Sequence, residues 1–266
     1  MNTGVLLFAY NNDQIDYVKL AEWSANRINQ FLNLPVTLVT DSPIENSVFD
    51  KIILTDTPAS SERFFSDLNQ NVSWKNGNRS DAFALTPYDD TLVLDVDYVV
   101  NSSDLTQLFY SSEDFLAPCT AYDVTGINDF SELNTFGKFN MPSLWATVLF
   151  FRKTHTAELL FSAVNMIKAN WQHYRDLYQI SKSNFRNDFA FAIAANLVFG
   201  QQAAWPSVAW KLASVCPGDV ITQITETKFK VNYTTPSNRP RYIEIADMDF
   251  HAMGKRSLGD IVANSC

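Results

Sequence analysis

The chain has 266 residues, 46% of them hydrophobic and 18% charged, which is typical of a globular protein with a sizeable core. Its net charge of −9 disfavours tight nucleic-acid binding, although a metal ion can still neutralise a diphosphate locally. No apolar run approaches the roughly 20 residues that span a bilayer. The N-terminus lacks the basic region of a signal peptide, and three distant cysteines favour a reducing compartment. We therefore expect a cytoplasmic protein without a transmembrane segment.

The first hundred residues alternate between expected strands and helices. A helix is expected over 13–32, because apolar residues recur there at helical spacing and Asn12 or Asp13 can cap its start. A shorter helix is expected over 61–68. Apolar runs typical of buried strands occupy 5–9, 36–40, 51–55 and 91–94. This β-α-β-β order predicts an α/β fold with a mixed, mostly parallel sheet flanked by helices.

The second half of the chain is less regular. The polar segment 122–142 is expected to be a long loop, and such loops are often lids or binding loops. The remaining expected elements are strands over 115–121 and 144–151, helices over 156–178 and 187–198, and a short strand from 243 that leads to Lys255. Because no repeat or clean linker interrupts the chain, we expect one domain over 1–266.

Polar side chains follow the expected strands at their carboxyl ends. They are Asn11, Asp41, Asp56 and the pair Asp95 and Asp97. Ligands of open α/β sheets bind beyond the carboxyl ends of the strands, so these positions indicate a ligand site at one edge of the sheet. Polar residues commonly end strands in any case, which makes the signal only moderately specific.

The pair Asp95 and Asp97 is the first metal-ligand candidate. Two carboxylates that converge repel each other, and Mn²⁺ or Mg²⁺ would compensate, since these ions take one or two protein carboxylates together with substrate phosphates. Asp95 and Asp97 flank Val96 at the point where the apolar run stops. We therefore expect the strand to end or turn there, so that both carboxylates can reach one ion. A solvated strand end with one aspartate capping a turn explains the pair equally well.

A compact segment near the C-terminus adds a third ligand. His251 is followed by Gly254 and Lys255. Neutral imidazole is a good ligand for Mn²⁺, glycine lets the backbone approach a ligand, and a lysine ammonium suits a phosphate. A lone histidine is usually structural, but this spacing favours a phosphate-facing loop.

These motifs resemble those of GT-A glycosyltransferases, and they are most similar to the family-eight group of glycogenin and related galactosyltransferases. The likeness is closest over 92–109, where Leu-Val-Leu-Asp-Val-Asp is followed by Asp-Leu-Thr-Gln-Leu-Phe. Arg79 occupies the place of the family's donor-facing arginine. The family's C-terminal His-x-x-Gly-x-x-Lys loop is here two residues shorter, from His251 to Lys255. Its Asn-x-Gly is absent from 140–147, and its Asp-Gln pair is here Asn187-Asp188.

The resemblance implies a nucleotide-sugar donor, with a UDP-sugar favoured, and Mn²⁺ or Mg²⁺ as cofactor. The implied metal ligands are Asp95, Asp97 and His251. The implied donor contacts are Ala9, Tyr10, Asn11, Asp41, Arg79, Asp95, Val96, Gly254 and Lys255. Residues 1–110 would form the donor half, and 111–266 the acceptor half with the C-terminal metal and diphosphate loop.

The catalytic roles that the resemblance implies belong to Arg79 and Asp188. Arg79 would stabilise the charge that develops on the diphosphate, while Asp188 would face the sugar or the acceptor. An ordinary acidic residue in a first helical turn explains Asp188 equally well. The acceptor would enter beside 122–142, and the sequence leaves its class open among a glycan, a protein, a lipid headgroup and a modified DNA base.

Two other function classes stay open. A haloacid-dehalogenase-like phosphatase also has an apolar strand followed by Asp-x-Asp, with Asp95 as nucleophile and Asp97 as acid and base. That motif normally opens its domain, whereas some ninety residues precede it here. A non-catalytic nucleotide-sugar binder would share the same fold, but it would not need both aspartates and His251.

Overall fold

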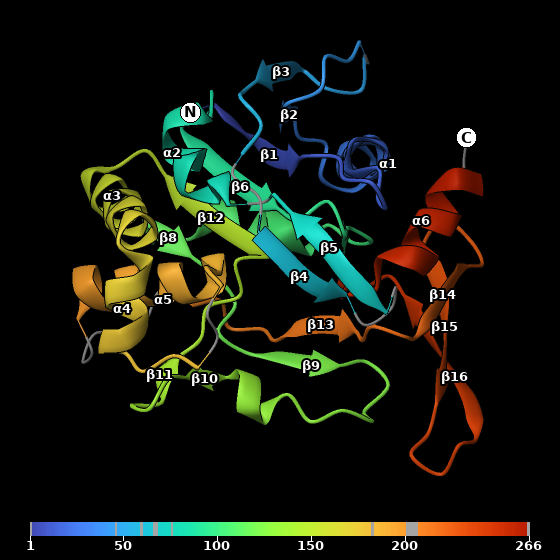
Figure 1. The fold of residues 1–266 in the computed structure, drawn as a ribbon. Helices are drawn as coiled ribbons and strands as arrows, with labels where there is room; N and C mark the ends of the chain where they lie inside the picture. The colour runs from blue at the N-terminus through green and yellow to red at the C-terminus, as the bar shows by residue number, and fades with distance from the viewer. Residues whose placement is uncertain are drawn as a thin grey trace.

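The computed structural model describes residues 2–45, 47–58, 61–65, 69–75, 77–181, 184–200 and 207–264. Its central sheet has the strand order β3-β2-β1-β6-β12-β8 (Figure 1). The strands are β1 (Thr3–Ala9), β2 (Val36–Thr40), β3 (Lys51–Leu54), β6 (Asp90–Leu94), β8 (Phe115–Leu116) and β12 (Val148–Arg152). The first four pair in parallel, and β12 pairs antiparallel with both β6 and β8. The expected mixed, mostly parallel sheet is confirmed.

Helices cover both faces of this sheet, and β1 shows how the core is divided. Val5 and Leu7 pack toward α1 (Tyr17–Leu32), whereas Leu6 and Phe8 lie in the cluster that contains α3 (His155–Ala169) and α5 (Asn187–Phe199). The helices α2 (Ala82–Leu85) and α4 (Trp171–Leu177) lie on the α3 side (Figure 1). Because both faces are covered, β1 has no solvent face, which explains its unbroken apolar sequence.

Two smaller sheets complete the described fold. One has the order β7-β17-β13-β9, and the other has the order β14-β15-β16. Their strands are β7 (Tyr98–Val99), β9 (Ala121–Asp123), β13 (Leu212–Val215), β14 (Val220–Gln223), β15 (Lys228–Thr234), β16 (Pro240–Ala246) and β17 (Phe250–Ala252). The C-terminal helix α6 (Lys255–Asn264) packs against β14. The first of these sheets joins both halves of the chain, because β7 pairs with β17.

Short elements fill the connections. They are the hairpin β4 (Ser61–Phe65) and β5 (Gln70–Trp74), the hairpin β10 (Thr135–Phe136) and β11 (Met141–Pro142), and the 3₁₀ helices η1 (Asn78–Asp81), η2 (Asp104–Tyr110) and η3 (Ser131–Leu133). The expected loop 122–142 therefore contains β9, η3 and the β10–β11 hairpin. Among the described residues no helix has both the length and the apolar character needed to cross a membrane.

Several element boundaries differ from those expected. The predicted helix over 61–68 is wrong, since its described residues 61–65 form β4, and the side chain of Asn184 donates to the carbonyl of Glu62 at 2.8 Å. The first helix starts only at Tyr17, because the Asn12 side chain accepts from two nearby backbone N–H groups in a turn, and Asp16 caps the helix. The predicted helix 156–178 breaks at Asn170 into α3 and α4.

The expected strands of the second half are shorter than predicted. The strand over 115–121 is reduced to the two residues of β8, and the strand over 144–151 begins only at Val148. Because β12 begins only at Val148, residues 145–147 lie outside the sheet and line the site described below.

A buried arginine that the sequence reading did not identify joins α1 to the rest of the fold. Arg27 is 5% exposed, and its guanidinium donates to the carbonyl of Val100 at 2.7 Å, to the side chain of Asn101 and to the carbonyl of Glu226. Burial lowers the pKa of Arg27 to about 10, so the group stays charged at neutral pH. This network fixes the segment that follows β7 and thereby supports the neighbouring Asp97.

Candidate active site

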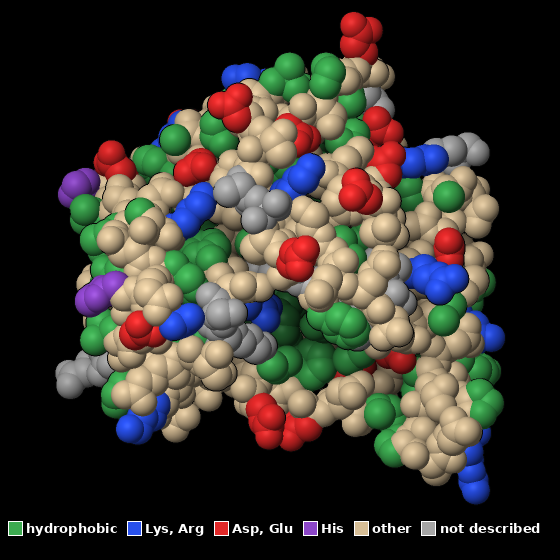
Figure 2. Space-filling view, viewed as in Figure 1, with side chains coloured by type: hydrophobic (Ala, Val, Ile, Leu, Met, Phe, Trp, Pro, Cys, Tyr) green, Lys and Arg blue, Asp and Glu red, His purple; other side chains and the backbone are tan. Residues whose placement is uncertain are grey.

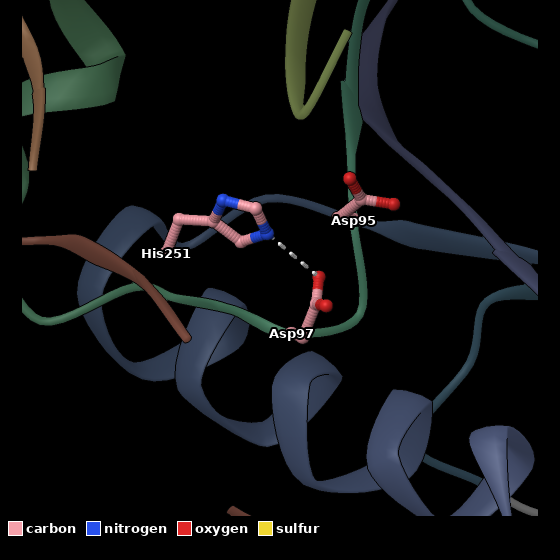
Figure 3. Close-up of side chains that lie close together, drawn as sticks. All are labelled: Asp95, Asp97 and His251. Carbon is pink, nitrogen blue, oxygen red and sulfur yellow. Dashed lines mark ion pairs between the residues drawn. The ribbon is translucent and has the colours of Figure 1, made fainter. Parts of the chain in front are cut away.

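Asp95 and Asp97 lie in a turn that directly follows β6. The backbone N–H of Tyr98 donates to the carbonyl of Asp95 at 3.0 Å, which closes the turn. The expectation that the strand ends here is therefore confirmed. Without this turn the two carboxylates would belong to a continuing strand, whereas the turn lets both approach one point (Figure 3).

His251 reaches the same point from the other end of the chain. Strand β17 pairs antiparallel with β7 so that His251 is opposite Tyr98, and the N–H of Ala252 donates to the carbonyl of Asp97 at 2.9 Å. The Nε2 atom of His251 lies 3.6 Å from Oδ1 of Asp97 (Figure 3). Backbone pairing between residues more than 150 positions apart thus brings the histidine to the aspartates.

The three side chains fit a divalent cation. One potential ligand atom each of Asp95, Asp97 and His251 lies within 4.8 Å of the others. Two carboxylate oxygens and one imidazole nitrogen are a donor set that suits Mn²⁺ and, with more water ligands, Mg²⁺. Nδ1 of His251 is buried and has no hydrogen-bond partner among the described residues, so the ring is not committed to another structural role.

Two cations balance the aspartates. Arg79, which is 2% exposed, forms an ion pair with Asp95 and donates to the carbonyl of Ala146. Lys255 pairs with Asp97. Burial lowers the pKa of Arg79 to about 10, and Asp97 and Asp188 act against this lowering.

The pKa of Asp97 shows which effect dominates inside the site. Burial raises the pKa of this carboxyl, but Lys255 and His251 outweigh burial and hold the pKa well below its ordinary value. Asp97 is therefore ionised at any physiological pH, as a metal ligand must be.

These groups line a cavity of about 830 Å³. The face of the molecule drawn in Figure 2 is hollowed near its centre, with hydrophobic side chains inside the hollow. The charged side chains among its described lining are the acidic Glu62, Asp95, Asp97 and Asp188 and the basic Lys75, Arg79, Arg186 and Lys255. Four cations therefore face four carboxylates in a protein whose net charge is −9, which makes the cavity the favoured place for an anionic ligand.

Most of the predicted site residues meet in this cavity, and four do not. Those that line it are Tyr10, Arg79, Asp95, Val96, Asp97, Asp188, His251 and Lys255. Ala9 is buried in the core beside α1. The side chain of Asn11 accepts from the backbone N–H of Val18. The backbone carbonyl of Asn11 accepts from the ammonium of Lys75 at 2.7 Å. Gly254 is buried directly before α6 and is not part of the lining.

Asp41 lies beside the cavity rather than in its lining. Its carboxylate accepts from the hydroxyl of Thr57 at 2.9 Å and lies 4.0 Å from the ammonium of Lys75, which does line the cavity. Tyr10, at the end of β1, is 4% exposed, and burial raises its pKa. Tyr10 and Lys75 thus both line the cavity, with Asp41 behind the lysine.

Asp188 lies in the first turn of α5 and is held on both oxygens. Its Oδ1 accepts from the backbone N–H of Ala146 at 3.0 Å, and its Oδ2 accepts from Arg186 at 2.8 Å. This carboxylate therefore holds the segment after Leu144 against α5. The contacts define a positioning role, and a direct role toward a sugar or an acceptor stays a prediction.

Sequence reasoning missed two groups of lining residues. The β4–β5 hairpin contributes Glu62, Phe64, Asn71, Ser73 and Trp74. The segment before β12 contributes Trp145, Ala146 and Thr147. The residue type of Asn69 is a signal for the hairpin, because asparagine tolerates a left-handed backbone better than most residues. In the structure Asn69 has a φ of 51° directly before β5. No signal in the sequence indicates where Trp145 lies.

A second acidic group lies apart from these residues. Asp123, Cys216 and Asp219 also bring one ligand atom each within 4.8 Å of one another. The Asp123 carboxylate, however, accepts four hydrogen bonds, from the backbone and side chains of Thr125 and Asn128. Those bonds fix the loop 123–128, and they give this aspartate a structural role.

Comparison with known proteins gives matches only among solved structures. No family model matches the sequence, and no curated protein matches it. The glycosyltransferase GlyE from Streptococcus pneumoniae TIGR4 is 16% identical, over 79% of this chain and 46% of that chain, with a TM-score of 0.42. The galactosyltransferase LgtC, solved with donor and acceptor sugar analogues, is 11% identical over 73% and 70%, with a TM-score of 0.44.

Mouse xyloside xylosyltransferase 1 is 13% identical, over 74% of this chain and 82% of that chain, with a TM-score of 0.44. The matching structures also include nucleotidyltransferases. This chain spans less than half the length of GlyE. The structural neighbours are thus glycosyltransferases and nucleotidyltransferases of low identity, and the function has to be argued from the residues of the site.

Proposed function

We propose that this protein transfers a sugar from a nucleoside-diphosphate donor, with a UDP-sugar favoured, to an acceptor, and that it does so with a divalent cation. The observation that carries the proposal is the convergence of Asp95, Asp97 and His251 in one cavity beside Arg79 and Lys255. Carboxylates and an imidazole suit the ion, while the arginine and the lysine suit the diphosphate. Few other ligands need both sets of groups together.

Each side chain has a defined task in this proposal. Asp95, Asp97 and His251 would hold Mn²⁺ or Mg²⁺, which when bound acts as a Lewis acid toward the diphosphate. Arg79 is buried and held by the carbonyl of Ala146, so its charge is already in place before the donor binds. Lys255 pairs with Asp97 in the absence of ligand and can pass to a phosphate oxygen.

The same contacts bear on the phosphatase alternative. A carboxylate nucleophile needs an oxygen that can reach the phosphorus, but Asp95 already pairs with the buried Arg79. The pairing reduces the nucleophilicity of that carboxylate and favours a role in binding. This supports sugar transfer over hydrolysis through an aspartyl phosphate. A binder without catalysis would use the same contacts, so turnover has to be measured.

The test is calorimetric titration with UDP, GDP, ADP and CDP, with and without Mn²⁺, followed by measurement of UDP release from a panel of UDP-sugars. We expect Mn²⁺-dependent nucleotide binding that weakens at least tenfold in His251→Ala. His155→Ala is the matched control, because the side chain of His155 is 81% exposed and is not among the described residues that line the cavity. Equal binding by wild type and His251→Ala would refute the metal assignment, and hydrolysis of a generic phosphate ester without nucleotide binding would support the phosphatase.

A further inference from the structure

A second cavity adjoins the first. It has a volume of about 460 Å³, within the range of about 300–1,000 Å³ typical of small-molecule sites. Pro217 and Met253 line both cavities. Since Met253 lies two residues after His251, the second cavity begins next to the proposed metal site.

Two stacked aromatic rings connect the linings of the two cavities. Trp145 lines the first cavity and Phe130 lines the second. Their ring centroids are 6.1 Å apart and their planes differ by 9°. Trp145 is 9% exposed, and its Nε1 is buried. This N–H has no hydrogen-bond partner among the described residues.

The lining of the second cavity selects one class of ligand. Its polar side chains are Thr125, Asn128, Asp129, Glu132, Asp219 and Thr234, which supply carboxylate, hydroxyl and amide groups. Its apolar surface comes from Phe130 and Tyr233 and from Ile127 and Leu133, which are 37% and 40% exposed. No lysine, arginine or histidine is among the described residues that line it. Hydrogen-bond acceptors beside apolar faces suit hydroxyl groups on a ring, whereas three carboxylates repel a phosphate backbone.

We propose that this second cavity is the acceptor subsite and that it binds an uncharged saccharide. The proposal rests on the proposed function and narrows its acceptor from a glycan, a protein or a DNA base to a neutral sugar chain. The donor's sugar would be transferred from the first cavity to the saccharide in the second, beside the stacked rings of Trp145 and Phe130. Asp123 supports the subsite, because its four hydrogen bonds hold the loop that forms one wall.

Tyr233 offers the sharpest test, because a matched control lies on the neighbouring strand. Tyr233 on β15 lines the cavity, while Tyr242 on β16 is 61% exposed and lies opposite Asn232, on the other face of the same sheet. The probes are maltose, cellobiose, a dimer of glucosamine and a single-stranded DNA dodecamer. Binding of each to the full chain is followed by saturation-transfer NMR, with and without UDP and Mn²⁺.

We expect maltose or cellobiose to bind, and Tyr233→Ala to weaken this binding at least tenfold while Tyr242→Ala leaves it unchanged. Trp145→Phe, which replaces the indole by a smaller ring and so removes part of the stack on Phe130, should also weaken saccharide binding, and Trp210→Phe, outside both cavities, should not. A circular-dichroism melt of each variant shows whether it is folded, and Glu132→Gln at an exposed lining position replaces Tyr233→Ala if that variant unfolds.

The result that overturns the proposal is the absence of saccharide binding, or binding that Tyr233→Ala and Glu132→Gln do not change. A DNA dodecamer or a glucosamine dimer that binds in a Tyr233-dependent way overturns it as well. These outcomes are distinct from failure of the proposed function, which UDP and Mn²⁺ titration measures separately. Saccharide binding without UDP binding would refute the transferase and, with it, the acceptor role of this cavity, and would leave a saccharide-binding site without a donor site.

Discussion

Asp97 and Lys255 form a coupled pair whose strength can be worked out from the structure. Asp97 is 5% exposed, and the side chain of Lys255 is 14% exposed. Lys255 is the first residue of α6, where the helix dipole is unfavourable for a cation, so Asp97 also offsets that effect. Removal of one partner from a buried ion pair costs about 3–5 kcal/mol. Since Lys255 retains some contact with water, we expect about 3 kcal/mol for Asp97→Asn, at the lower end of that range.

The assay is urea unfolding in EDTA, followed by tryptophan fluorescence. In a thermal melt of the same variant, a loss of about 3 kcal/mol in a domain of this size corresponds to a fall in Tm of roughly 6–12 °C. The double variant Asp97→Asn with Lys255→Met should recover most of the loss, because the uncompensated ammonium is then gone as well. A coupling free energy of about 2–3 kcal/mol is therefore expected from the double-mutant cycle.

Mn²⁺ provides the second arm of this experiment. The ion should raise the unfolding free energy of the wild type, by about 2.7 kcal/mol at one hundred times its Kd, and leave Asp97→Asn unchanged. Asp90→Asn is the matched control, because Asp90 is also 5% exposed and pairs at 3.4 Å with Arg152 of the neighbouring strand β12, at the opposite end of β6 from Asp95. The reasoning is refuted if the two single substitutions add without coupling, or if Mn²⁺ stabilises Asp97→Asn as much as the wild type.

Three further predictions follow from other parts of the structure. Gly4→Ala should cost about 1–3 kcal/mol in urea unfolding, because a Cβ there would lie 2.4 Å from the ring of Tyr88, which is buried and hydrogen-bonded to Thr37. No loss would mean that the ring can move. Burial and Asp123 raise the pKa of Asp219 to about 6, above its unfolded value of about 3.9, so the native state keeps a proton that the unfolded state releases between these values. The stability of the wild type should therefore fall as pH rises from 4 to 6, and Asp219→Asn should reduce this fall, to which Asp249 also contributes because its pKa is raised to about 6 as well; an unchanged pH profile would contradict the assignment. Asp249→Ala should weaken Mn²⁺ binding measured by calorimetry, because the Asp249 carboxylate accepts from the backbone of Asn101 and Ser102 at 2.6 and 2.7 Å and so ties the segment after β7 to the strand of His251. Wild-type affinity in that variant would show that the β7–β17 pairing suffices alone.

The amino-acid pattern determined the architecture of the first half of the chain. The run 5–9 is apolar throughout because a strand covered on both faces has no solvent side, and β1 contains those residues. The site was readable for a related reason. Paired carboxylates after such a strand are costly unless something compensates for them, and that cost pointed to Asp95 and Asp97.

The motif around His251 marked that residue as a candidate ligand, but only the tertiary structure decided how it joins the two aspartates. His251 reaches Asp97 through the pairing of β17 with β7, and a hydrogen bond between strands so far apart leaves no periodic trace in the sequence. The same holds for the β4–β5 hairpin, where local propensity allowed a helix but long-range contacts such as that of Asn184 with Glu62 favour strands. Asn11 shows the converse, since a polar residue at a strand end can bind a ligand or, as here, the first turn of the next helix. The choice depends on which partner lies within hydrogen-bond distance, and that is a property of the folded chain alone.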